Sequence, residues 1–197
     1  MRLYYLAGMG VAAVLLACEA PASDNPVANG LTPAAVTASS HGGHDHDMEH
    51  ERGHFATERE LFRLRRDTDQ FHSIPRAERA GYAAFGPCFD NPGVGGMGYH
   101  WANQALIGDS AIDVRKPELL VYRPTPDGGR QLAAVEYIVF VDEWHAKGHV
   151  NPPKLFGLEF HINPTLLEKP FYLLHVWAWY PNPSGTFMDW NPRVSCS

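Results

Sequence analysis

Four side chains that could do chemistry stand in stretches dominated by apolar and aromatic residues. They are His100 in GMGYHWANQAL, Glu136 in LAAVEYIVFV, His161 in GLEFHIN and His175 in FYLLHVWAWY. A carboxylate or imidazole in such surroundings must be paired, hydrogen-bonded or metal-bound, because an isolated buried charge is costly. We expect the four to form one site, as ligands of a divalent transition metal (zinc or copper) or as a Glu–His acid–base pair. The alternative is that each is a structural polar group satisfied by its own neighbour.

Aromatic side chains close to these residues predict the walls of a pocket. Trp101 follows His100 directly, and Trp177 and Trp179 follow His175 at alternate positions. Asn103 would add a hydrogen-bonding group. Ligand pockets are typically apolar and aromatic with a few polar groups. The first hypothesis is therefore a protein that binds a metal ion or a small ligand. Two alternatives stay open: an enzyme that acts on a small molecule through the same residues, and an envelope structural domain without a ligand site.

A histidine-rich tract before the folded part is a second candidate for metal binding. Its histidines are interleaved with aspartates and glutamates: they are His41, His44, His46, His50 and His54. Imidazole binds zinc, copper and nickel, and nearby carboxylates raise the local affinity for cations. Such a tract binds metal without a fold and with low selectivity. The alternative is a solvated polar spacer.

Other patterns argue against common activities. Residues 93–98, GVGGMG, match the glycine pattern of dinucleotide-binding folds. An Asn-Pro turn precedes them and no βαβ unit surrounds them, so no nucleotide cofactor is expected. His145 and His149 have the spacing of helical metal ligands, but Gly148 and the prolines that follow favour an exposed loop. The net charge of −6 predicts no nucleic-acid partner.

The N-terminus has the features of a lipoprotein signal. Arg2 precedes an uncharged run that ends in LLAC, and this run is too short to span a bilayer. The small residue before Cys18 resembles the lipobox of bacterial lipoproteins, which implies cleavage after residue 17 and acylation of Cys18. Because Glu19 follows, we expect an anchor in the cell envelope, on the periplasmic face of the outer membrane if the cell is Gram-negative. The alternative is an ordinary signal peptide with a chance cysteine.

Composition divides the chain into three parts. Residues 1–17 form the expected signal peptide. Residues 18–56, rich in Ala, Pro, Ser, Thr and His, indicate a flexible tether, and residues 57–197 form a single domain. With Cys18 assigned to lipid, Cys88 and Cys196 remain. An even pair in an exported domain predicts a disulfide; a nucleophilic Cys88 thiol is the alternative.

Turn signals and hydrophobic periodicity predict an α+β domain: two N-terminal helices followed by a curved, mainly antiparallel sheet that can wrap into an open barrel. A Thr-x-x-Glu capping box starts the first helix and a first-turn proline starts the second. Asp-Gly between two β-branched runs indicates a hairpin. The expected helices cover residues 58–69 and 75–86, the expected strands cover 117–124, 130–141, 155–162 and 171–180, and residues 88–98 are expected to be loop.

A set of short motifs runs through the second half of the chain. They are GPC, MGYHWAN, PELLVY, AVEY, LFGLEFH, LHVWAWYPNPSGTF and WNPRVSC. Together they make the stretch from Tyr82 to Cys196 resemble a group of exported bacterial proteins with no named activity. The resemblance implies export and a shared fold, but no substrate. The lipobox and the histidine-rich tract lie outside it.

Overall fold

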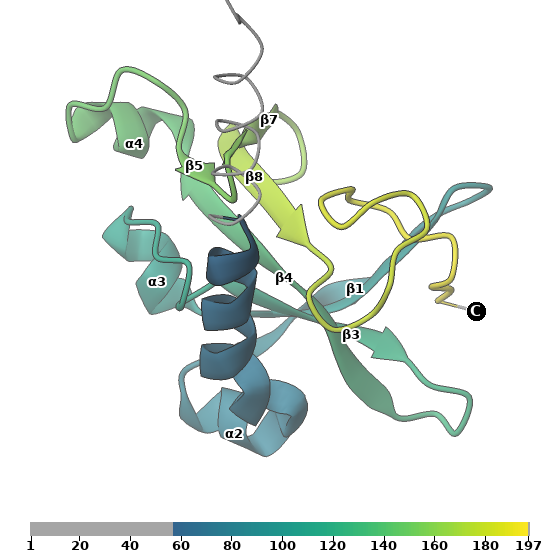
Figure 1. Cartoon of the computed structure of the whole chain (residues 1–197). Coiled ribbons are helices and arrows are strands. Elements are labelled where there is room, and N and C mark those ends of the chain that lie inside the picture. Colours follow the sequence, from purple (N-terminus) through teal and green to yellow (C-terminus); the bar gives the residue numbers. More distant parts are fainter. Residues whose placement is uncertain (1–56, 197) are drawn as a thin grey trace, which may run out of the picture. The chain divides into compact units, whose positions relative to one another are not determined.

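The computed structural model describes residues 57–196 (Figure 1). The expected signal peptide, the lipid-bearing Cys18 and the histidine-rich tether lie outside the described residues. None of the described helices is both long and apolar enough to cross a membrane.

Helices at the start of the domain cover one face of a sheet. The first spans residues 57–68, close to the predicted bounds, and buries Leu61 and Leu64 in the core. A short 3₁₀ helix, η1 (Asp69–His72), leads into α2 (Ile74–Arg79), which has a proline in its first turn. The predicted continuation of this helix to residue 86 is wrong. Gly81 takes a φ of +95°, and the chain leaves the helix there to enter the first strand.

Six antiparallel strands form one curled sheet, a half-barrel, so the predicted α+β class is confirmed (Figure 1). In spatial order the strands are β1 (Ala83–Asn91), β2 (Gly95–Ala102), β3 (Leu119–Pro124), β4 (Arg130–Phe140), β8 (Phe171–Val176) and β7 (His161–Asn163). The connections contain α3 (Gln104–Asp109), α4 (Val141–Ala146) and a separate pair of short strands, β5 (Lys154–Leu155) and β6 (Leu158–Glu159). The hairpin between β3 and β4 turns at residues 125–129, as Asp-Gly predicts.

Within residues 88–98, which we expected to be loop, only residues 92–94 form a turn, whereas residues 88–91 end β1 and residues 95–98 begin β2. Their glycines permit close packing of backbones rather than a free loop. A Cβ on Gly95 would lie 2.3 Å from the Asn191 carbonyl oxygen, and a Cβ on Gly98 would lie 2.5 Å from the Tyr122 carbonyl oxygen. The glycine pattern therefore reports contacts with distant segments, which local sequence does not reveal.

Two predicted strands are shorter in the structure. Residues 155–162 are divided among β5, β6 and β7, because Phe156 and Gly157 take φ values of +55° and +74°. β8 ends at Val176 rather than at residue 180. Beyond it the Trp177 N–H donates to the Thr186 carbonyl instead of a strand neighbour.

The two faces of the sheet are packed differently. The face under the helices holds the main core, with Leu120, Tyr122, Val135 and Tyr137 fully buried. The opposite face carries two smaller apolar clusters: Ala102, Leu119, Ile138, Phe171 and Leu173 in one, and Val121, Ala133, Ala134, Trp177 and Val194 in the other. Burial on both faces explains why the central strands are nearly continuous apolar runs.

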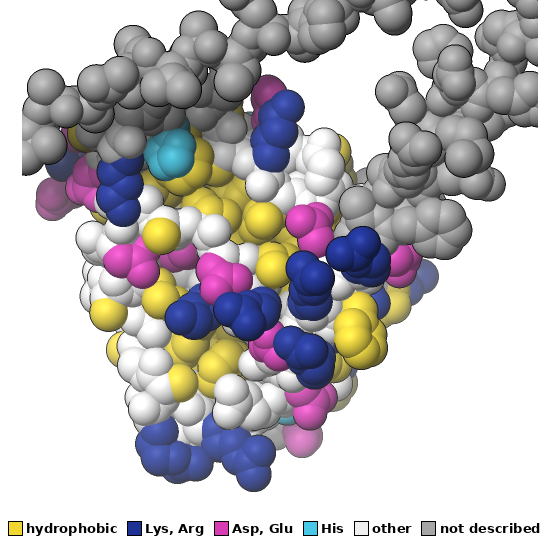
Figure 2. Space-filling model, turned by 60° about the vertical axis from the view of Figure 1, so that its left-hand side comes forward, with side chains coloured by type: hydrophobic (Ala, Val, Ile, Leu, Met, Phe, Trp, Pro, Cys, Tyr) yellow, Lys and Arg dark blue, Asp and Glu magenta, His cyan; other side chains and the backbone are white. Residues whose placement is uncertain are grey.

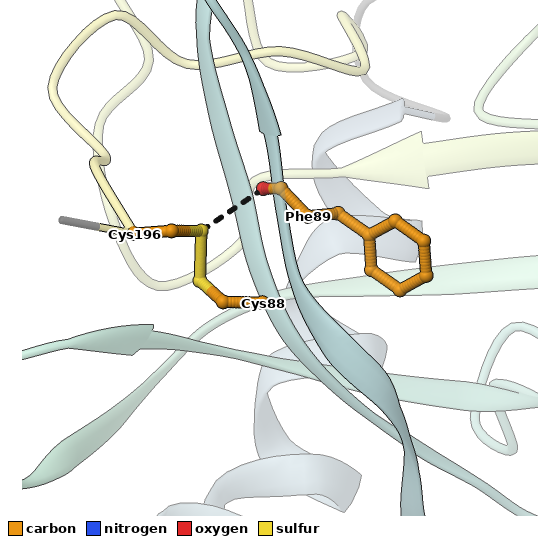
Figure 3. Close-up of a disulfide and its surroundings, with 3 residues drawn as sticks. All are labelled: Cys88, Phe89 and Cys196. Atoms are coloured by element: carbon orange, nitrogen blue, oxygen red, sulfur yellow. Dashed lines mark hydrogen bonds between the residues drawn. A yellow bond between two sulfur atoms is a disulfide. The ribbon is translucent and has the colours of Figure 1, made fainter.

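A disulfide joins Cys88 of β1 to Cys196 near the C-terminus, as predicted (Figure 3). The two Cα atoms are 5.7 Å apart, and 108 positions separate the cysteines in sequence. Nearby, Gly96 and Asn191 exchange backbone hydrogen bonds, so the C-terminal segment lies beside the β1–β2 hairpin (Figure 1). The ring of Phe89, next to Cys88, points away from the disulfide (Figure 3).

Charged side chains of both signs are interspersed on the face of the domain shown in Figure 2. Ion pairs among the described residues include Arg66 with Asp67 at 2.7 Å and Lys154 with Glu159 at 3.0 Å. The face in view therefore presents a mixed surface rather than an extended field of one sign.

Candidate functional site

His100, Glu136 and His175 meet on the sheet face opposite the helices. The register places Glu136 of β4 directly opposite His175 of β8, and His100 comes from β2, two strands away on the other side. His175 Nδ1 lies 3.0 Å from Glu136 Oε1, and His100 Nε2 lies 3.4 Å from Glu136 Oε2. One carboxylate therefore bridges two imidazoles. We call these three residues the His–Glu–His cluster.

The His–Glu–His cluster is almost fully buried, with exposed fractions of 4% for His100, 6% for Glu136 and 0% for His175. Burial by itself raises the pKa of the Glu136 carboxyl. The two imidazoles lower it by more, His100 first and His175 second, so this pKa lies well below its ordinary value. Glu136 is therefore an ionised carboxylate that accepts hydrogen bonds from both rings.

Each imidazole of the cluster uses only one of its ring nitrogens. His100 Nδ1 and His175 Nε2 are buried and have no hydrogen-bond partner among the described residues. Buried polar atoms in native proteins are nearly always hydrogen-bonded, to protein, water or ligand. The cluster thus satisfies its carboxylate but leaves two nitrogens whose bonding capacity is unused within the domain.

A cavity of about 240 Å³ lies beside the cluster, with His100 and Glu136 in its wall. Its aromatic lining residues are Phe85, Phe89, Phe140 and Phe171, and it also meets residues 166–168 of the loop before β8. A dry engineered cavity of roughly 150 Å³ binds benzene. This cavity therefore has room for a substituted benzene or a short aliphatic chain.

His161, the fourth predicted member, lies outside the cluster. Its side chain is 49% exposed, and its Nε2 lies 3.3 Å from Asp189 Oδ2. The hydrogen bond to Asp189 raises the pKa of His161 against the opposing effect of burial, and Glu136 adds a smaller upward effect. His161 is thus near enough to the cluster to interact with its charge, but its direct partner is Asp189.

The predicted pocket walls differ from those in the structure. Trp101 packs on Tyr122 in the core under the helices, and Asn103 caps the N-terminus of α3. Trp177 lies against His175, with ring centroids 4.8 Å apart, and donates to the Met188 carbonyl. Trp179 donates to the Thr68 hydroxyl. None of the four predicted wall residues lines the cavity that His100 and Glu136 border; phenylalanines form its aromatic walls instead.

Among residues 57–196, no group of three or more His, Cys, Asp or Glu side chains is arranged to hold a metal ion. In the His–Glu–His cluster each imidazole engages a different carboxylate oxygen, so the three side chains are spread around the carboxylate rather than aimed at one point. His145 belongs to α4 rather than to a loop, and its Nε2 lies 2.9 Å from the Tyr172 hydroxyl.

The sequence did not reveal the phenylalanine walls of the cavity. Phe85 and Phe89 stand in a predicted helix and a predicted loop, whereas in the structure both belong to β1, whose pairing with β2 shifts register between them. Glu118, directly before β3, is a second buried carboxyl, although it does not line the cavity: it is 1% exposed, and its Oε2 accepts from the Ile138 N–H at 3.2 Å. Burial raises the pKa of Glu118 to about 9, so this carboxyl is neutral at pH 7.

No family model, curated protein or solved structure matches this chain. The function is therefore argued from the site alone.

Proposed function

We propose that the domain binds a small, mainly apolar organic molecule in the cavity beside the His–Glu–His cluster. The observation that carries the proposal is the combination of a phenylalanine-walled cavity with two buried polar side chains, His100 and Glu136, in its wall. Protein interiors are close-packed, so a space without a binding role would normally be filled by apolar side chains. An apolar cavity with a small number of polar groups in its wall is typical of small-molecule sites.

The unused Nδ1 of His100 supports the same proposal, because His100 lines the cavity. Leaving a buried polar atom unpaired costs about 1–3 kcal/mol. A ligand that hydrogen-bonds to the cluster would offset part of that cost, so the domain should be more stable with the ligand bound.

Titration of the full chain with benzyl alcohol tests the proposal. We expect saturable binding by calorimetry and a higher melting temperature in the presence of the ligand. Ile107 lines the cavity, so Ile107→Trp should fill part of it and weaken binding about tenfold or more. Val94 is 49% exposed and does not line the cavity, so Val94→Trp is the matched control and should bind like the wild type. Unsaturable binding, or equal affinity in Ile107→Trp, would contradict the proposal.

An acid–base enzyme is the second candidate, and the pairing of His100 with Glu136 at the cavity wall favours it. In that case His100 would exchange a proton with the bound molecule while Glu136 orients the ring. Chemical conversion of a bound molecule by the wild type, but not by His100→Gln, would assign the enzyme; binding without conversion assigns the binding protein.

We also propose two roles for residues before the domain. The histidine-rich tract (His41, His44, His46, His50 and His54) would capture zinc or copper with low selectivity, and lipid on Cys18 would anchor the chain in the envelope. Zinc titration of the full chain should show weak binding that is lost when the five histidines are changed to asparagine. Unchanged zinc binding by that variant would contradict the metal role.

A further inference from the structure

We infer that the cavity selects organic cations: small molecules with an apolar body and a protonated amine. This inference rests on the proposed function, because it describes which ligands the same cavity prefers. Two observations support it: the negative charges of the carboxylates that line the cavity, and the aromatic side chains that form its walls.

The charges that line the cavity are all negative. Of the described residues that line it, only Glu136 and Glu168 carry charge; the others are apolar, apart from Gln104 and His100. The neighbouring Lys169 lies 3.4 Å from an Asp142 oxygen and 3.8 Å from a Glu143 oxygen, and does not line the cavity. Lys169 Nζ also lies 5.7 Å from the centroid of the Phe140 ring, which is a cavity wall, but Asp142 and Glu143 share its charge. Among the residues that line the cavity, no lysine or arginine is present to pair with a bound anion.

The His–Glu–His cluster holds a carboxylate at the cavity wall. Both rings direct one nitrogen at Glu136, which lines the cavity. Glu136 is the one acidic side chain of the cluster, and the two imidazoles keep its pKa well below the ordinary value, so it is ionised at pH 7.5. The outer nitrogens, His100 Nδ1 and His175 Nε2, have no partner among the described residues, and of these two histidines only His100 lines the cavity.

The remaining charged neighbours do not reverse this sign. His161 faces Asp189 at 3.3 Å, so that pair has no net charge when His161 is protonated. A ligand ammonium group would bring a positive charge and N–H donors to a cavity whose lining carboxylates are Glu136 and Glu168.

The walls of the cavity suit the same ligand. Phe85, Phe89, Phe140 and Phe171 present aromatic rings, whose faces attract cations and exclude water. Unit charges about 6 Å apart interact strongly in surroundings of low effective dielectric. Glu136 would repel a carboxylate ligand by the same electrostatic interaction with which it attracts a protonated amine.

Three probes with the same ring and different polar groups test the inference: benzylamine, benzyl alcohol and benzoate, titrated into the full chain at pH 7.5 by calorimetry. We expect benzylamine to bind about tenfold or more tightly than benzyl alcohol, and benzoate to bind more weakly than both. The affinity of benzylamine relative to benzyl alcohol should fall only in part in 0.5 M salt. Salt screens the exposed Glu168, whereas the attraction to the buried Glu136 should persist.

Variants separate the two carboxylates. Glu136→Gln should reduce the preference for benzylamine over benzyl alcohol to the two- to threefold that Glu168 supplies. Glu168→Gln should reduce the wild-type preference about two- to threefold without harm to the fold, because Glu168 is exposed. Glu159→Gln, on an exposed residue outside the cavity, is the control and should change nothing. If Glu136→Gln does not fold, the wild-type ranking and Glu168→Gln still decide the question.

Equal binding of all three probes, or tighter binding of benzoate, would overturn the inference while the proposed function stands. Binding of none of them would overturn the proposed function itself.

Discussion

At the scale of single residues, the buried carboxylate Glu136 holds two imidazoles in place and is held in turn by them. Because its pKa is lowered in the folded state, its ionised form stabilises the fold above its ordinary pKa of 4.5, and that contribution is lost as the pH falls below 4.5 toward the folded value. The residue that defines the candidate site is therefore also a source of stability at neutral pH.

Glu136→Gln should lower the free energy of unfolding at pH 7 by about 3 kcal/mol, because an amide cannot accept hydrogen bonds from both imidazoles. The difference from the wild type should shrink below pH 4.5, where the wild-type carboxylate begins to lose its advantage. Urea unfolding at several pH values measures both effects. Glu159→Gln, whose carboxylate is exposed, should change stability by less than about 1 kcal/mol. Equal stability of Glu136→Gln and wild type at pH 7 would refute the bridging role.

Glu118 behaves in the opposite way, since burial raises the pKa of its carboxyl from 4.5 to about 9. Between these values the folded state keeps a proton that the unfolded state releases, so this residue makes the protein less stable as the pH rises from 4.5 to 9. Glu118→Gln keeps the acceptor for the Ile138 N–H but has no proton to lose. It should therefore be more stable than the wild type at pH 8, by up to about 5 kcal/mol, and similar to it at pH 4. A less stable variant at pH 8 would mean that Glu118 is ionised and paired.

At the scale of elements, the β1–β2 hairpin depends on glycines that touch other segments. Gly98 has a φ of +113°, and the Tyr122 carbonyl of β3 occupies the position beside it. Gly98→Ala should cost about 3 kcal/mol in urea unfolding, since it adds both backbone strain and a clash. Gly93 also has a positive φ but has no atom within 4 Å of its Cβ position. Gly93→Ala therefore isolates the strain and should cost about 1 kcal/mol; equal effects of the two substitutions would argue against the clash.

The disulfide between Cys88 and Cys196 attaches the C-terminal segment to β1, the strand that supplies Phe85 and Phe89 to the cavity. In the chain-entropy model, removal of a cross-link between residues 108 positions apart lowers the free energy of unfolding by roughly 4–5 kcal/mol. The double variant Cys88→Ser, Cys196→Ser should melt at a lower temperature than the wild type and bind benzyl alcohol more weakly. Mass spectrometry of the native protein should find the two peptides joined. Free, alkylatable thiols in protein isolated from the envelope would contradict this pairing.

At the scale of the whole molecule, we propose one folded domain attached to a membrane through its N-terminal segment. Cys18→Ala should abolish labelling by palmitate and move the protein from the membrane fraction to the soluble fraction, because the acylated sulfur is then absent. The melting temperature of the domain should not change. Ser39→Ala, between the lipobox and the histidines, is a control that should be labelled normally. Undiminished labelling of Cys18→Ala would contradict the lipoprotein proposal.

Local sequence determined the elements whose signals are short-range. The capping box predicted the first helix, Asp-Gly predicted the β3–β4 hairpin, and long apolar runs predicted the central strands. These succeeded because caps, turns and side-chain alternation depend on residues close together in the chain. Alternation could also have placed Trp101 correctly: it is adjacent to His100, so the two must face opposite sides of a strand.

Tertiary structure alone decided how these elements meet. The strand order brings β2, β4 and β8 together, so His100 and His175 share one carboxylate although 74 residues separate them. The same order leaves His161 beside Asp189 instead, near the edge of the sheet. Residues 95–98 became strand because Gly95 and Gly98 fit against the Asn191 and Tyr122 backbones, contacts that exist only after the chain has folded. Cavity walls depend on such long-range contacts, which is why their phenylalanines were not predicted while the buried Glu–His pairing was.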